Sequence, residues 1–322
     1  MSDDIVIGID TSNYTTSLGI VSVDGEVLAN IKMPLGVEEG KRGLRQSDAL
    51  FNHTKNIPQI VDIASHITKN KRVVAVGVSE KPRNEDGSYM PCFLAGVSAA
   101  SAMALANNIP LYRFSHQCGH IMAALYSAGA MRLKDEHFLA YHVSGGTTEF
   151  LSVSPTDNGF LTEKIGGTLD LNAGQVVDRV GVMLGFRFPC GSMIEKSALA
   201  YDGEEKVNPH ICVRDTWANF SGLENMARKL ISDGYGESYV CAFVIAFIEK
   251  TLDKITHNYI AKNGKMPIVF AGGVMSNSII RKHLSEKYGA YFAIPEFSSD
   301  NAVGTALLAL LKYRGLTDYQ SK

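Results

Sequence analysis

Two stretches of this sequence share one pattern, IVIGIDTSNYTTSLGIV at residues 5–21 and FLAYHVSGGTTEFLSV at residues 138–153. Each consists of an apolar segment, a short turn of hydroxyl-bearing residues or glycine, and a second apolar segment. This pattern predicts two antiparallel strands joined by a tight turn. Because it occurs near the start of each half of the chain, it indicates two similar folding units. We therefore predict two α/β lobes, each with a mixed sheet and flanking helices.

Strand and helix patterns continue outside these two hairpins. Apolar runs predict further strands at about 26–32, 73–79 and 267–271. Apolar or small residues at helical spacing predict helices at about 47–67, 93–107 and 301–313. The charged stretch at 80–91, which contains proline and glycine, is predicted to be a loop.

The composition is that of an ordinary globular protein. Hydrophobic residues make up 45% of the 322 residues and charged residues 20%, which excludes a disordered or fibrous chain. The net charge of −2 gives no electrostatic argument for nucleic acid. The five cysteines are widely spaced and form no CxxC pair, which argues against a disulfide framework or a cysteine zinc site. The acidic start, Met1 to Asp4, and the absence of a long apolar run lead us to expect a cytoplasmic protein without membrane association.

Three polar or glycine turns follow apolar strands directly. They are Thr11-Ser12-Asn13, Ser144-Gly145-Gly146-Thr147 and Gly272-Gly273. Small residues let backbone N–H groups approach a phosphate closely. One such turn is usually only a turn, but three at corresponding places predict a nucleotide held between two lobes. The sequence has neither a Walker A motif nor GxGxxG, so P-loop and Rossmann interpretations are poor.

His116 and His120 form an HxxxH motif, HQCGH. On a helix these two positions share one face, so that both imidazoles can bind one metal ion. Gln117 stands where a zinc protease would carry its glutamate base, which disfavours a protease. Asp300, just before the last helix, is either a third ligand or a helix N-cap. The two histidines are either ligands or structural residues.

Asp178 lies in an apolar-patterned segment that ends near Gly185 and is followed by Phe188-Pro189-Cys190-Gly191. We interpret this segment as a helix and a rigid turn. Either the turn closes over a ribose, or Asp178 and the turn are ordinary surface features.

Taken together, these motifs make the sequence resemble the TsaD family of tRNA threonylcarbamoyl transferases over about residues 5–315. The matching segments are GIDTS (8–12), HQCGH (116–120), HVSGGTTEF (142–150), DLNAGQVVDRVGVMLGF (170–186), FSGL (220–223), AGGVMSN (271–277) and FSSDN (297–301). The resemblance implies an actin-like ATPase (ASKHA) fold, which is a duplicated ribonuclease-H-like fold. It also implies that His116, His120 and Asp300 bind one divalent ion, iron or zinc.

The site residues expected from the motifs and the resemblance fall into two groups. Asp10 and Asp178 are the candidate catalytic carboxylates. The nucleotide and substrate contacts are Thr11, Ser12, Val143, Ser144, Gly145, Gly146, Thr147, Asp178, Gly191, Gly272, Gly273 and Asn277.

The duplicated pattern and the resemblance lead to an expected division of the chain. One lobe should contain residues 1–114 and 301–322 and the other residues 115–300, with nucleotide and metal in the cleft between them. Asp300 should then lie at the hinge, opposite His116 and His120, which open the second lobe.

The family's reaction transfers a threonylcarbamoyl group from its adenylate to an adenosine of tRNA, which makes the expected protein a transferase. The expected partners are an ATP- or AMP-type nucleotide, tRNA and other subunits of a modification complex. The chain departs from the family at 13–16, where an acidic pair is missing, at the 80–91 loop, and at Glu224-Asn225 in place of Lys-Thr. These departures keep two alternatives open: a non-catalytic nucleotide-binding partner of a true transferase, and an ATPase or kinase with Asp10 facing the γ-phosphate.

Overall fold

The polypeptide divides into two units, each built on one mixed β-sheet. The computed structural model describes residues 3–12, 14–36, 44–205 and 207–320; Asn13 of the first polar turn lies outside these ranges. Unit 1 comprises 1–127, 155–161 and 297–322, and unit 2 comprises 128–154 and 162–296. No helix among the described residues is long and apolar enough to cross a membrane. The expected cytoplasmic location stays a prediction.

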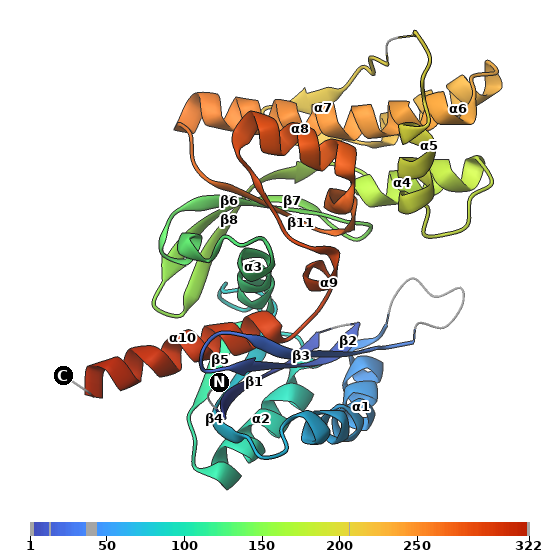
Figure 1. The fold of residues 1–322 in the computed structure, drawn as a ribbon. Helices are drawn as coiled ribbons and strands as arrows, with labels where there is room; N and C mark the ends of the chain where they lie inside the picture. The colour runs from blue at the N-terminus through green and yellow to red at the C-terminus, as the bar shows by residue number, and fades with distance from the viewer. Residues whose placement is uncertain (1–2, 13, 37–43, 206, 321–322) are drawn as a thin grey trace. The chain divides into compact units, whose positions relative to one another are not determined.

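The sheet of unit 1 has the strand order β3-β2-β1-β4-β5 (Figure 1). The strands are β1 (Asp4–Ser12), β2 (Thr15–Ser22), β3 (Val27–Pro34), β4 (Arg72–Lys81) and β5 (Leu111–Ser115). The first three strands are antiparallel neighbours, whereas β4 is parallel to β1 and β5 to β4. The helices of this unit are α1 (Gln46–Ile67), α2 (Phe93–Asn107), α3 (His116–Ser127) and α10 (Val303–Gln320). The short α9 (Pro295–Ser298) lies at the boundary of the two units.

Unit 2 repeats this order in the run β8-β7-β6-β11-β12 of its seven-stranded sheet. The strands are β6 (Phe138–Val143), β7 (Thr148–Thr156), β8 (Gly159–Thr168), β9 (Cys212–Arg214), β10 (Trp217–Asn219), β11 (Ile268–Ala271) and β12 (Tyr291–Phe292). As in unit 1, the hairpin strands β6 and β7 are antiparallel, and β11 and β12 continue in parallel. The predicted duplication is therefore confirmed.

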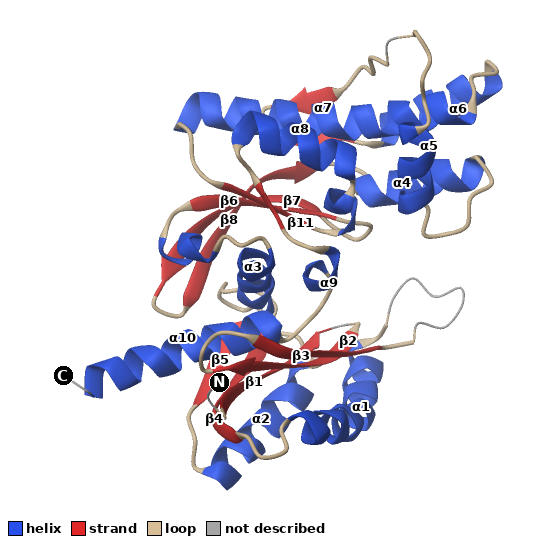
Figure 2. Cartoon of the chain, viewed as in Figure 1, coloured by secondary structure: helices blue, strands red, loops and turns tan. Residues whose placement is uncertain are grey.

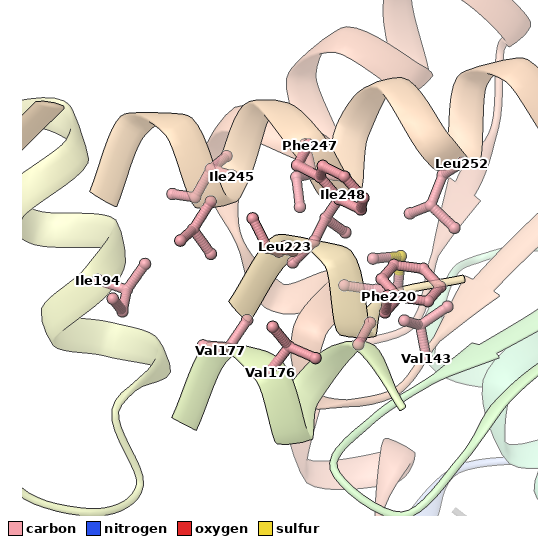
Figure 3. Close-up of a cluster of buried hydrophobic side chains, with 14 of the residues drawn as sticks. Val143, Val176, Val177, Ile194, Phe220, Leu223, Ile245, Phe247, Ile248 and Leu252 are labelled. Atoms are coloured by element: carbon pink, nitrogen blue, oxygen red, sulfur yellow. The ribbon is translucent and has the colours of Figure 1, made fainter. Parts of the chain in front are cut away.

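The helices of unit 2 lie on one face of its sheet (Figure 2). They are α4 (Ala173–Met183), α5 (Gly191–Leu199), α6 (Ser221–Ser232), α7 (Glu237–Asn263) and α8 (Ser278–Tyr288), with 3-10 turns η1 (Met131–Asp135) and η2 (Gly273–Ser276). The core lies where α4, α6 and α7 meet, with Val176, Leu223 and Ile248 among its buried side chains (Figure 3). This core fixes α4 and α6 next to each other.

A row of glycines lets α10 lie directly on the sheet of unit 1. Gly8 is paired with Gly19 on one side and with Gly77 on the other, so the three glycines cross three adjacent strands. A Cβ at Gly8 would meet the Ala302 carbonyl oxygen at 2.4 Å, and one at Gly77 would meet that of Thr305 at 2.6 Å. Only glycine allows this approach, which fixes the start of α10 over the sheet.

The same helix approaches α3 through a second pair of glycines. A Cβ at Gly304 would lie 1.8 Å from the carbonyl oxygen of Gly119. This contact joins α3, which begins with His116, to the segment that carries Asp300. It also explains why α3 belongs to unit 1.

Replacing Gly304 with alanine is therefore expected to destabilise the protein. The added methyl must force α3 and α10 apart, and overpacking of this kind costs about 2–3 kcal/mol of unfolding free energy. Gly222→Ala in α6 is the matched control, because a Cβ there meets no atom within 4 Å. It should leave stability unchanged or raise it by up to about 1 kcal/mol. Urea unfolding of both variants measures the difference, and equal stabilities would contradict the close-packing argument.

The observed division differs from the expected boundary at 114/115. The boundary lies after α3, at 127/128, and again at 296/297 before Asp300. His116, His120 and Asp300 consequently lie in one unit, and not on opposite sides of a hinge. That nucleotide and metal share a cleft between the lobes stays a prediction.

Candidate metal centre and nucleotide site

Three side chains of unit 1 bring their ligand atoms together. His116 and His120 occupy the first and fifth positions of α3, one helical turn apart. The distances are 3.0 Å between the two Nε2 atoms, 3.2 Å from His120 Nε2 to Asp300 Oδ1 and 3.6 Å from His116 Nε2 to Asp300 Oδ1. Asp300 does not cap α10, since Asn301 Oδ1 accepts the hydrogen bond of Val303 N–H. The sequence-based ligand set therefore lies together in space.

The donor set fits one transition-metal ion. Atoms bound to a common zinc ion at about 2.0–2.2 Å, with angles of about 90–110° between them, lie roughly 2.8–3.6 Å apart, which matches the three distances. Two imidazoles and one carboxylate suit zinc or iron and leave coordination positions open for a substrate oxygen. All three side chains are partly exposed, so such a position is accessible.

Asp10 supports this cluster from the sheet. Its Oδ2 lies 2.8 Å from His116 Nδ1, and its Oδ1 accepts a hydrogen bond of 3.0 Å from Ser12 N–H. The side chain is 1% exposed. A buried carboxylate on Nδ1 fixes the ring and its tautomer, so that Nε2 faces the other two ligand atoms.

The carboxylates around His116 also control its protonation. Burial disfavours the charged imidazolium, but Asp10 and Asp300 outweigh burial and raise the pKa of His116 to about 10. Burial raises the pKa of Asp300, but hydrogen bonds with His116 and His120 hold that pKa well below its usual range. The cluster is thus built to hold positive charge, which a divalent cation would supply in place of a proton.

The 80–91 loop, where the chain departs from the family, contacts the start of α3. The carbonyl of Pro82 accepts a hydrogen bond from Gln117 N–H, and the Asn84 amide donates to the Phe160 carbonyl and to Cys118 Sγ. These contacts tie the 80–91 loop to the helix that carries both histidines.

The predicted glycine turns of unit 2 pack on one another through their backbones. Ser144 Oγ accepts hydrogen bonds from Gly146 N–H and Thr147 N–H, which closes the first turn. A Cβ at Gly174, near the start of α4, would lie 2.6 Å from Gly145 N. Gly272, at φ +105°, approaches the Val143 carbonyl in the same way. The glycines therefore bring three chain segments together.

A cavity of about 370 Å³ opens beside these turns, within the size range of small-molecule sites. Its walls come from the β6–β7 turn, α4, α5, α7 and the segment before α8. The lining residues are Gly145, Gly174, Val177, Asp178, Pro189, Gly191, Ser192, Ile194, Glu195, Ile245, Ile248, Gly273, Val274, Ser276, Asn277 and Ile280. A Cβ at Gly145, Gly191 or Gly273 would meet no atom within 4 Å, so backbone groups there stay accessible.

The predicted contacts divide between cavity and turns. Gly145, Asp178, Gly191, Gly273 and Asn277 line the cavity. Val143, Ser144, Gly146, Thr147 and Gly272 belong to the turns that shape it, whereas Thr11 and Ser12 lie buried at the end of β1 in unit 1. Glu195, which also lines the cavity, was not predicted, although it follows Gly191 by one helical turn and shares its face of α5.

Two polar residues of the cavity are held in place by helix ends. Asp178 Oδ1 accepts a 2.8 Å hydrogen bond from Cys190 N–H, which fixes the turn before α5. Asn277 Oδ1 caps α8 by accepting from Ile279 N–H and Ile280 N–H at 3.1 Å. These hydrogen bonds fix the orientation of the Asp178 carboxylate and of the Asn277 amide at the cavity wall.

Comparisons with known proteins relate most of this chain to one family. Residues 27–307 match the family profile described as TsaD, tRNA N6-adenosine threonylcarbamoyltransferase. A relative of that name from Methanopyrus kandleri is 28% identical, covering 95% of this chain and 87% of the relative. One from Thermosipho africanus is 30% identical, covering 96% and 94%.

Solved structures show the same fold at low identity. HypF of T. kodakarensis has a TM-score of 0.60 at 13% identity and covers 97% of this chain and 48% of its own. Component A of (R)-2-hydroxyglutaryl-CoA dehydratase from Acidaminococcus fermentans has a TM-score of 0.53 at 14% identity, covering 96% and 99%. These similarities concern the fold alone, and they confirm the predicted two-lobe ASKHA architecture.

Proposed function

The chain belongs to the TsaD family of tRNA N6-adenosine threonylcarbamoyltransferases, and we propose that it transfers a threonylcarbamoyl group from its adenylate to an adenosine of tRNA. The clustering of His116, His120 and Asp300 carries this proposal, because a subunit that only binds nucleotide needs no such ligand set. The cavity lined by Gly145, Asp178 and Asn277 supports an adenylate donor.

The proposed chemistry is an acyl transfer. The exocyclic amine nitrogen of the adenosine bonds to the carbamoyl carbon and loses a proton. The anhydride bond between that carbon and the phosphate oxygen breaks, and AMP leaves with the electron pair. Exposed backbone groups at Gly145 and Gly273 suit the phosphate, and the free oxygen of Asp178 suits a ribose hydroxyl.

We propose that His116, His120 and Asp300 hold one iron or zinc ion. When bound, such an ion acts as a Lewis acid toward the carbonyl of the carbamoyl group. The surrounding residues of unit 1 orient both Nε2 atoms and the Asp300 carboxylate toward one point.

Incubation of the chain with threonylcarbamoyl-adenylate and unmodified tRNA tests the proposal. We expect AMP release that depends on tRNA and equals the threonine incorporated. Phosphate release from ATP without incorporation would instead favour the ATPase alternative. Nucleotide binding without either reaction would favour the non-catalytic subunit.

Asp10 was expected to be a catalytic carboxylate, but both of its oxygens are engaged, by His116 and by Ser12 N–H. We propose that it is a positioning residue. Asp10→Asn should lower zinc affinity about 10–100-fold, the effect of losing an outer carboxylate partner. Competition with a chelator measures this affinity. Asp4→Asn on the same strand is the control, and equal affinities in the two variants would contradict the role of Asp10.

A further inference from the structure

A second hollow of unit 2 opens next to the nucleotide cavity. It has a volume of about 740 Å³ and is more open to solvent. We call it the α4–α6 groove; its lining residues are Gly145, Gln175, Asp178, Arg179, Val182, Met183, Phe188, Glu224 and Arg228. Gly145 and Asp178 line both hollows, so a ligand in the groove lies next to one in the nucleotide cavity.

The walls of the groove are rigid because their inner faces form the core of unit 2. Val176 and Val177 of α4 are buried together with Leu223 of α6 (Figure 3). The opposite face of α4 therefore presents Arg179 and Val182 outward. The start of α6 is fixed by Asp170, whose carboxylate accepts hydrogen bonds from Phe220 N–H and Ser221 N–H. These bonds contribute to a pKa of about 2 for Asp170, against the effect of burial.

Two arginines are held across the groove by one carboxylate. Arg179 Nη1 and Arg228 Nη2 donate to the two oxygens of Glu224 at 2.9 Å and 3.1 Å. Their side chains remain 50% and 64% exposed. With Asp178, which also lines the groove, the two guanidinium groups face two carboxylates, so the groove carries no net charge and any anion must bind to the arginine N–H groups themselves. Each guanidinium has further N–H donors in a fixed fork, which is the geometry that recognises phosphate.

Apolar surface at the groove is exposed to solvent. Phe188 is 75% exposed and Val182 57% exposed. An exposed aromatic ring beside arginines is the combination on which unpaired nucleobases stack while phosphates are neutralised. A purely apolar partner would offer no acceptor to the guanidinium N–H groups that Glu224 leaves available.

We propose that the α4–α6 groove binds the unpaired acceptor nucleotides of the RNA substrate. The base stacks on Phe188, and flanking phosphates bind Arg179 and Arg228. This inference rests on the proposed function, since it assigns the acceptor to a place beside the donor. The Glu224 that replaces the family's lysine then orients both arginines.

Binding of unmodified tRNA and of AMP, measured separately, tests the groove. Phe188→Ala should weaken tRNA binding about 5- to 150-fold, the range for losing one stacked base. Arg179→Gln/Arg228→Gln should flatten the dependence of log affinity on log salt concentration by about 1–2. In the double variant, Glu224 loses both of its arginine partners. A triple variant that also carries Glu224→Gln removes this unpaired carboxylate. AMP affinity should be unchanged throughout, because none of these side chains lines the nucleotide cavity.

Leu199→Ala and Arg214→Ala are the matched controls, both of exposed residues outside the groove, and they should bind tRNA normally. If the groove variants bind tRNA as the unaltered chain does, the groove assignment is overturned and the proposed function survives. If the unaltered chain binds AMP but not tRNA, the proposed function falls, and the groove assignment with it.

Discussion

A protein carrying His116→Ala and His120→Ala is expected to purify without iron or zinc and to lose threonylcarbamoyl transfer almost completely. The double change removes two of three ligands, and Asp300 alone cannot retain the ion. A bound ion stabilises the charge that develops in the transition state by several kcal/mol. Without the ion, turnover should therefore fall about 10³-fold or more. Elemental mass spectrometry of protein without a histidine tag gives the metal content, and mass spectrometry of digested tRNA gives the activity.

A second double variant controls for the loss of histidine itself. His66→Ala/His210→Ala removes two exposed imidazoles outside the cluster. It should keep about one metal ion per chain and full activity. A full complement of metal in the His116→Ala/His120→Ala protein would show that the ion is bound elsewhere. Absence of metal from both proteins and from the unaltered chain would make the two histidines structural.

Asp178→Ala is expected to weaken AMP binding about 10- to 100-fold. A hydrogen bond to a charged group contributes about 1.5–3 kcal/mol, and alanine removes the oxygen that we assign to the ribose. It also removes the acceptor of Cys190 N–H, which loosens the turn before α5. Titration calorimetry with AMP measures the affinity.

Asp178→Asn separates these two contributions. The amide keeps an oxygen for Cys190 N–H but loses the negative charge, so its AMP affinity should lie between those of the alanine variant and the unaltered chain. An Asp178→Ala protein with unchanged AMP affinity would exclude Asp178 from nucleotide binding.

The parts of the fold that the sequence predicted are those with strong periodicity. The two hairpins are found as β1–β2 and β6–β7, and their equivalent places in two sheets confirm the duplication. The helix expected at 93–107 is α2, with the same bounds. In each case local pattern and tertiary environment agree.

The long helix α7 was not predicted, for a physical reason. It is buried around much of its circumference, with Val240, Cys241, Val244 and Ile245 all in the core. Apolar residues at consecutive positions blur the helical period on which sequence prediction depends. The cavity walls that α7 supplies, Ile245 and Ile248, were missed with it.

The compact units differ from the expected lobes in the placement of α3, because this placement depends on a contact between distant residues. Gly119 and Gly304 are 185 positions apart, and their approach places α3 on α10. No local sequence pattern predicts such a contact. Likewise, the HxxxH spacing indicated His116 and His120, but the residues alone left Asp300 either a third ligand or a helix N-cap, and the family resemblance favoured the ligand. The engagement of both Asp10 oxygens was visible only in three dimensions.

Metal removal and replacement tests the central claim most directly. The chain would be stripped with a chelator, checked by elemental mass spectrometry, and assayed with threonylcarbamoyl-adenylate and unmodified tRNA before and after addition of one equivalent of zinc or iron. The account predicts that the stripped chain is inactive and that one ion per chain restores threonylcarbamoyladenosine in the tRNA. Full turnover by the stripped chain, or none by the reloaded one, would contradict it.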